Sequence, residues 1–95
     1  MNMENHITVK FFTVDRHIPD MKCDSVRVPV SDNSKGEFSG SYGIKKGHAR
    51  SVFSLKAGEV IVTAGGEELF LANISDGFAI VENNEVRITV DKIED

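Results

Sequence analysis

Several residue types that mark familiar protein classes are scarce in this chain of 95 residues, which has one cysteine, two prolines and no tryptophan. The single cysteine, Cys23, excludes an internal disulfide and suits a reducing compartment. No apolar run is long enough to cross a bilayer, and the start MNMENHITVKFF lacks the apolar core of a signal peptide. We therefore expect a small cytosolic protein that does not insert into a membrane.

Positive charge is also in short supply. Lysine and arginine total 11 residues against 15 aspartates and glutamates, so the formal net charge is -4. A nucleic-acid binder normally carries a basic surface, so this balance argues against that class. Lys45, Lys46 and Arg50 do form a local basic cluster, for which solvent exposure is the ordinary interpretation.

Catalytic and metal-binding motifs are missing as well. Gly43 and Gly47 do not match a phosphate-binding loop, which needs G-x-x-x-x-G-K-[ST] before a helix. No G-x-S-x-G nucleophile motif occurs. The possible zinc ligands are scattered along the chain: His6, His17, Cys23 and His48. We expect a binding module without metal or cofactor rather than an enzyme, and an enzyme or small-ligand binder would require a deep pocket lined by His17, Cys23 and acidic residues.

What the sequence does contain is a series of short segments with the alternation and composition of β-strands. Residues in seven segments fit this pattern: 7–14, 24–30, 49–55, 59–63, 68–74, 77–81 and 86–90. The regular spacing and the lack of an amphipathic helix predict an all-β fold. We expect one domain over residues 1–95, a small antiparallel β-sandwich or flattened barrel of about 8–10 strands.

Turn residues indicate where the predicted strands begin and end. The paired glycines at 65–66 and the asparagines at 83–84 predict two tight hairpins, because both residue types tolerate a positive φ. Pro29 predicts an edge, or the end of a strand, since proline cannot donate to a ladder. The Ser- and Gly-rich stretch Ser31–Gly43 reads as a loop.

Two longer stretches, GEF…YGIKKGHARSVFSLKAGEV and ISDGFAIVENNEVRITVD, resemble the N-terminal β-sandwich domain of the F-type ATP synthase epsilon subunit, the equivalent of the mitochondrial delta subunit. That family reads GEFGILPGHAPL, then L-K-P-G, then S-G-G-F before a last strand. The matching positions are Gly36-Glu37-Phe38, Gly43-Ile44, Gly47-His48-Ala49, Leu55-Lys56, Gly58, Ser75, Gly77-Phe78, Asn84, Val86 and Thr89-Val90-Asp91.

The chain departs from the family pattern in its loops. The family's L-P-G-H-A-P is here KKGHAR, so Lys46 and Arg50 replace both prolines. About four extra residues, Ser39 to Tyr42, lie after Phe38, and Asp76 replaces the second glycine of S-G-G-F. The sequence ends at VDKIED, where the family's C-terminal two-helix hairpin would begin, so we expect that hairpin to be missing.

The resemblance implies a non-catalytic central-stalk subunit of an F1Fo ATP synthase that links the gamma subunit to the c ring for proton- or sodium-driven ATP synthesis. It also implies a peripheral position on the cytoplasmic face of the membrane, without the inhibitory helical domain. The residues expected at the partner interface are Glu37, Phe38, Tyr42, Ile44, Lys45, Lys46, His48 and Arg50.

Three alternatives stay open at this point. Phe38 would serve equally well as a core residue that anchors its loop. His48 would serve equally well as a turn residue bonded to the local backbone. The whole chain would also fit a diverged stand-alone β-sandwich that binds a different protein outside the ATP synthase.

Overall fold

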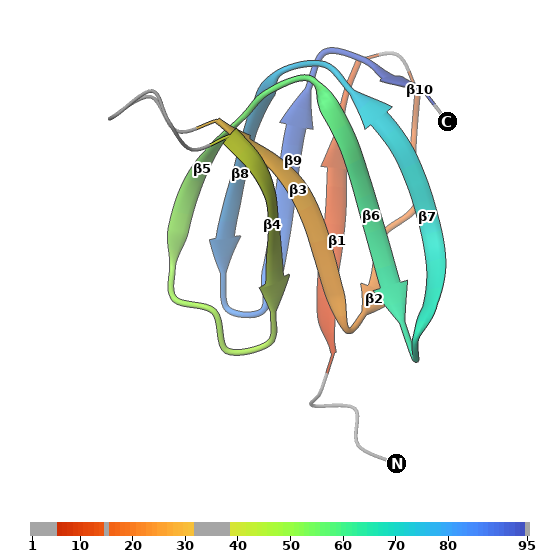
Figure 1. Cartoon of the computed structure of the whole chain (residues 1–95). Helices are drawn as coiled ribbons and strands as arrows, with labels where there is room; N and C mark the ends of the chain where they lie inside the picture. The colour runs from red at the N-terminus through yellow and green to blue at the C-terminus, as the bar shows by residue number, and fades with distance from the viewer. Residues whose placement is uncertain (1–5, 15, 32–38, 95) are drawn as a thin grey trace.

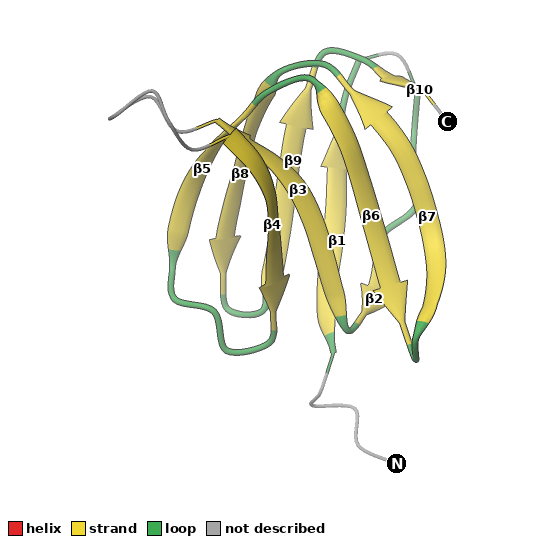
Figure 2. Ribbon diagram, in the orientation of Figure 1, coloured by secondary structure: helices red, strands yellow, loops and turns green. Residues whose placement is uncertain are grey.

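The computed structural model describes residues 6–14, 16–31 and 39–94, and Glu37 and Phe38 lie outside that part of the chain. The described residues form ten strands and no helix, which confirms the all-β prediction (Figure 2). The strands are β1 (Ile7–Phe12), β2 (Met21–Cys23), β3 (Ser25–Ser31), β4 (Ser39–Lys45), β5 (Ser51–Leu55), β6 (Gly58–Ala64), β7 (Glu67–Ile74), β8 (Gly77–Glu82), β9 (Glu85–Val90) and β10 (Ile93–Glu94).

The strands form one sheet that curls over into two facing layers (Figure 1). Its order is β10-β7-β6-β3-β5-β8-β9-β1-β2, and β4 pairs with β3 outside this path. In Figure 1, β3, β4, β6 and β7 lie in front of β8, β9 and β1. All pairs are antiparallel except β1 with β9. The sheet therefore has the shape of the predicted sandwich or flattened barrel.

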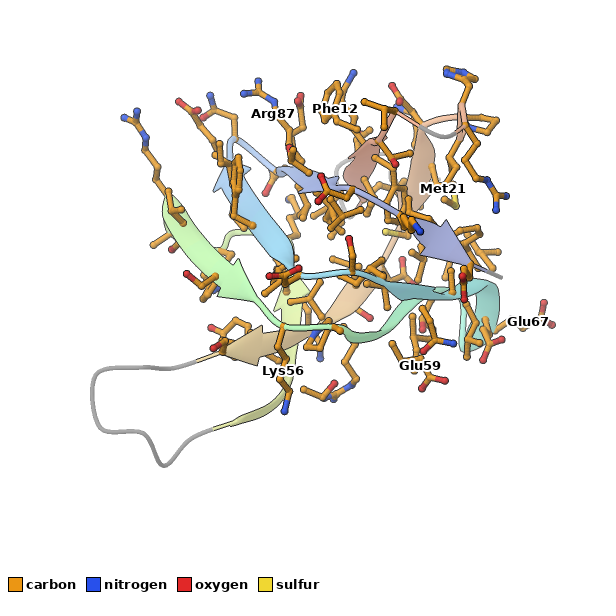
Figure 3. The ribbon with its side chains drawn as sticks, turned by 90° about the horizontal axis from the view of Figure 1, so that it is seen from above. Phe12, Met21, Lys56, Glu59, Glu67 and Arg87 are labelled. Atoms are coloured by element: carbon orange, nitrogen blue, oxygen red, sulfur yellow. The ribbon has the colours of Figure 1, made fainter. Side chains whose placement is uncertain are left out.

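The core lies between the two layers and is built by alternation along each strand. Val9 on β1, Val26 and Val28 on β3, and Ile88 on β9 are fully buried, as period-2 patterning requires. Residues at alternate positions of the strands point outward: Figure 3 shows Phe12 and Arg87 directed away from the sandwich on one side, and Glu59 on the other. No polar residue of the described part is buried in this core.

Both predicted hairpin turns are confirmed. Gly65 and Gly66 have φ values of 60° and 80° and join β6 to β7. Asn83 and Asn84 have φ values of 53° and 61° and join β8 to β9. Two consecutive positive φ values are the requirement of a two-residue turn whose twist matches that of the strands.

The prediction of a loop over Ser31–Gly43 is wrong in its second half, where Ser39–Lys45 forms strand β4. Serine and glycine have low strand propensity, but β4 pairs with β3 over seven positions, from Ser25 opposite Lys45 to Ser31 opposite Ser39. Since β3 is held by its buried valines, this pairing outweighs the local preference of β4.

The edge predicted at Pro29 is also wrong, because β3 continues through this residue with partners on both sides. The proline lies where β3 exchanges one neighbour for another: Ser25 to Arg27 pair with β6, and Val30 pairs with β5. A missing N–H costs little at such a junction. The short strands β2 and β10 add two elements that the sequence pattern did not predict.

Candidate functional site

The residues expected at a partner interface are distributed over β4 and the turn that follows it. The chain enters β4 at Ser39 and leaves it at Lys45, a length of roughly 20 Å for seven residues in extended conformation. Lys46, His48 and Arg50 therefore lie beyond the end of β4 that is opposite Ser39. Glu37 and Phe38 precede Ser39 in sequence and fall outside the described residues.

Tyr42 and His48 are joined by a hydrogen bond of 2.8 Å between the Tyr42 hydroxyl and Nε2 of His48. The other ring nitrogen, Nδ1, lies 2.8 Å from the carbonyl oxygen of Ala49. Because a carbonyl only accepts, Nδ1 carries the proton, and in the neutral ring Nε2 accepts from the tyrosine. The histidine is thus bonded on both sides, and its local role as a turn residue is observed directly.

Phe53 of β5 completes an aromatic cluster with these two residues. Its ring centroid lies 5.0 Å from that of Tyr42 and 5.7 Å from that of His48, at tilted and edge-on angles. Such arrangements are favourable for aromatic rings. All three residues are partly buried, so the cluster packs the turn between β4 and β5 onto the side of the sandwich.

The β8–β9 hairpin also holds the turn between β4 and β5 in place. Gly47 has a φ of 84° and donates its backbone N–H to Oδ1 of Asn84 over 2.9 Å. The backbone N–H of His48 donates to the carbonyl oxygen of Lys45 over 3.2 Å. The turn therefore has a fixed shape and presents its remaining side chains to solvent.

Those remaining side chains are basic. Lys45, Lys46 and Arg50 are all exposed. Arg50 approaches Oε2 of Glu82 at 3.8 Å, but the arginine side chain is 79% exposed, so water screens this pair strongly. The three cations are therefore available to a partner with negative charge.

Ile44, another of the expected contact residues, is fully buried and belongs to the core. Its side chain holds β4 against the sandwich and is not available to a partner. The alternation of β4 accounts for this, since Tyr42 and Ile44 point inward while Ser41, Gly43 and Lys45 are exposed.

The described residues contain no group of three or more His, Cys, Asp or Glu side chains placed to hold a metal ion. Cys23 is fully buried, and that burial raises the pKa of its thiol to about 11, which keeps the thiol protonated and unreactive. A groove of about 580 Å³ is lined by His17, Asp20 and Asp91 among others, but not by Cys23. It is open to solvent.

Sequence reasoning missed an apolar surface on the outer face of β5 and β8. Val52 is 71% exposed and Phe78 is 43% exposed, and Ile80 lies directly opposite Val52 across the two strands. Phe12 of β1 adds a further exposed aromatic ring on the same side of the sandwich (Figure 3). The signal was present, since Val52 and Ile80 sit at the outward positions of their alternating segments.

Charged pairs border this apolar surface. Nε of Arg87 lies 2.6 Å from Oε2 of Glu85, and Nζ of Lys10 lies 2.9 Å from Oδ2 of Asp20. These hydrogen bonds raise the pKa of both cations. An apolar centre with a charged rim is the usual composition of a protein-binding surface.

Comparison with known proteins identifies relatives of this chain among ATP synthase subunits. The ATP synthase epsilon chains of a Synechococcus strain and of a Cyanothece strain are each 35% identical to this chain over 88 residues, which are 93% of this chain. The chain spans 58% of the length of these curated relatives.

No helix that could span a membrane occurs among the described residues.

Solved structures share the fold. The Euglena gracilis mitochondrial ATP synthase structure of OSCP, F1 and c ring contains a chain that matches with a TM-score of 0.79 at 23% identity, over 98% of this chain and 55% of that one. The Tetrahymena thermophila structure of the mitochondrial central stalk and c ring gives a TM-score of 0.71 at 16% identity, over 93% of this chain and 65% of that one.

The family model of the ATP synthase delta/epsilon chain β-sandwich domain matches residues 6–95. That range contains all ten strands, the aromatic cluster and the basic turn. The chain therefore belongs to the delta/epsilon β-sandwich family of ATP synthase subunits.

Proposed function

We propose that this chain is a non-catalytic subunit of the central rotor of an F-type ATP synthase, peripheral to the membrane, that connects the gamma subunit to the c ring. The observation that carries the proposal is the relationship to epsilon chains at 35% identity over 93% of this chain. The packed core supports a mechanical role, because a protein interior of high packing density transmits force with little deformation.

Two partners fit the layout of the candidate contacts better than one. The segment with Glu37 and Phe38 precedes one end of β4, and the basic turn follows the other end. We assign the Glu37–Phe38 segment to the c ring. We assign the side of the sandwich, with the apolar surface around Val52 and Phe78, to the gamma subunit.

An interface with the gamma subunit would occupy a large part of this small domain. Formation of a stable interface buries about 800 Å² of accessible surface on each partner. That is a large share of this domain, whose accessible surface is 5827 Å². Apolar anchors at the centre of such an interface usually carry most of the binding energy. Val52 and Phe78 are the exposed candidates for such anchors on β5 and β8.

The test is reconstitution from one source. The chain is mixed with the gamma subunit and c ring of the same organism, and the complex is isolated by size-exclusion chromatography. The expected result is co-elution of this chain with both partners. Absence of a complex, under conditions in which a typical epsilon chain assembles with its own rotor, would contradict the proposal and favour a stand-alone binding module.

A further inference from the structure

Strand β4 has one edge along its whole length that pairs with no strand of the described part of the chain. Three strands pair with a single neighbour, namely β2, β4 and β10 in the described part of the chain. The first has three residues and the last has two, so their edges are too short to template another strand. The edge of β4 has seven residues and contains no proline.

The hydrogen-bond pattern of β3 identifies which groups face this edge. The N–H of Lys56 donates to the carbonyl oxygen of Pro29, so the main chain at Pro29 faces away from β4. In an antiparallel ladder, main-chain groups alternate between the two sides residue by residue. Ser41, which lies opposite Pro29, is thus not bonded to β3.

The N–H and C=O of Ser41 therefore point away from β3, to the open side of β4, and those of Gly43 do the same two residues later. Both residues are exposed. Neither has a side chain large enough to block the approach of another strand. The edge consequently offers two donors and two acceptors at the spacing of a β-ladder.

Positive charge is concentrated around the same edge in a chain whose net charge is -4. Lys45 ends β4, and Lys46 and Arg50 belong to the turn beyond it, all three exposed. Arg27 is also exposed, and its guanidinium lies over Gly43, where an added Cβ would be 3.8 Å from the nearer terminal nitrogen. Cations that flank an open edge favour an incoming segment with acidic side chains.

From these observations we propose that the open edge of β4 binds an extended, acidic segment of a neighbouring rotor subunit as an added strand. The inference rests on the proposed function, because it takes the partner from the rotor. Main-chain bonds to Ser41 and Gly43 would supply the ladder, and Lys45, Lys46 and Arg50 would select for carboxylates.

Residue-resolved hydrogen exchange tests the ladder directly. The free chain and the chain assembled with the gamma subunit and c ring are exchanged in deuterium oxide, quenched and compared. The amides of Ser41 and Gly43 should exchange rapidly in the free chain and at least about tenfold more slowly in the complex. The amides of Tyr42 and Ile44, which face β3, should be protected in both states.

A matched pair of variants tests the contribution to binding. Ser41→Pro removes the outward N–H and leaves the bonds between β3 and β4 in place, whereas Ser41→Ala keeps that N–H. We expect Ser41→Pro to weaken assembly roughly tenfold and Ser41→Ala to change it less than about twofold, with similar melting temperatures for the two variants. The double variant Lys45→Glu, Lys46→Glu should weaken assembly at low salt and lose this effect as the salt concentration rises.

The outcomes separate this inference from the proposed function. A complex that forms while Ser41 and Gly43 exchange at their free rates would overturn the added strand and leave the rotor assignment in place. If the amides of Ser41 and Gly43 in the free chain become more protected from exchange as the chain concentration rises, a second copy of this chain occupies the edge. That result would overturn the proposal of an acidic rotor segment. Failure to form any complex would overturn both proposals, since no rotor segment would then reach the edge.

Discussion

The hydroxyl of Tyr42 donates to Nε2 of His48, and this bond ties β4 to the turn that follows it. Replacing Tyr42 with phenylalanine keeps the ring against Phe53 but removes the hydrogen bond. We expect a loss of about 1 kcal/mol in the free energy of unfolding, measured by urea denaturation. An unchanged midpoint would show that solvent replaces the tyrosine at no cost and that the bond does not fix the turn.

Gly77 starts β8 so close to β9 that no side chain fits. A Cβ at this position would collide with the carbonyl oxygen of Thr89 and the side chain of Val90. We expect Gly77→Ala to lower stability by roughly 2 kcal/mol or more, because the backbones of β8 and β9 must separate. Gly43→Ala is the matched control, since its Cβ would make only an ordinary contact at 3.8 Å, and an equal loss in both variants would contradict the explanation.

The two asparagines of the β8–β9 turn have different roles despite similar backbone angles. Asn84 accepts a hydrogen bond from Gly47, whereas Asn83 only adopts the positive φ of the turn. Asn83→Gly should be neutral or slightly stabilising, and Asn84→Gly should cost about 1 kcal/mol because the bond to the basic turn is lost. Thermal unfolding of the two variants side by side measures the difference, and equal midpoints would refute it.

The buried thiol of Cys23 predicts a loss of stability in alkaline solution. Burial raises its pKa in the folded chain to about 11, from an ordinary value of 9.0. The unfolded chain loses the thiol proton first as pH rises, so the stabilising contribution is complete below pH 9 and is lost between about pH 9 and pH 11. Other groups also titrate in this range, so the comparison is with Cys23→Ala.

We expect the wild type to lose on the order of 2 kcal/mol more than Cys23→Ala over that interval. Urea denaturation at a series of pH values from 8 to 11 provides the measurement. Parallel stability curves for the two proteins would contradict the prediction. Thiol reagents at neutral pH give a second check, because Cys23 should react only when the chain unfolds.

The Glu37–Phe38 segment gives a prediction about the c ring. Replacing both residues with alanine should weaken binding of the c ring more than it lowers the melting temperature. A large fall in melting temperature, with unchanged binding per folded molecule, would identify Phe38 as a core residue instead. The two measurements are a binding titration with purified c ring and a thermal melt of the same preparation.

The sequence predicted most of the sandwich because alternation reports burial directly. The alternation in residues 24–30 predicted a strand there, and Val26 and Val28, two positions apart in it, are both fully buried. The turns at 65–66 and 83–84 could also be predicted from the sequence, since few residues tolerate a positive φ. Strand β4 could not be predicted from the sequence, because its Ser and Gly residues adopt a strand only through their pairing with β3.

Only part of the candidate site could be predicted from the sequence. The exposure of Lys45 and Lys46 followed from their charge, but the bond between Tyr42 and His48 depends on a contact across a turn that no periodic pattern encodes. The burial of Ile44 was missed because β4 itself was missed. The apolar surface around Val52 was missed although Val52 and Ile80 occupy the outward positions of their alternating segments.

The parallel pairing of β1 with β9 sets the order in which this chain can fold. Thr8 lies opposite Glu85, so β1 finds its long partner only after β9 has left the ribosome. The local hairpins β6–β7 and β8–β9 are able to form earlier, because their loops are short to close. Closure of β1 onto β9 is then a late and slow step, and a chain that stops before β9 leaves the apolar side chains of Ile7, Val9 and Phe11 without cover.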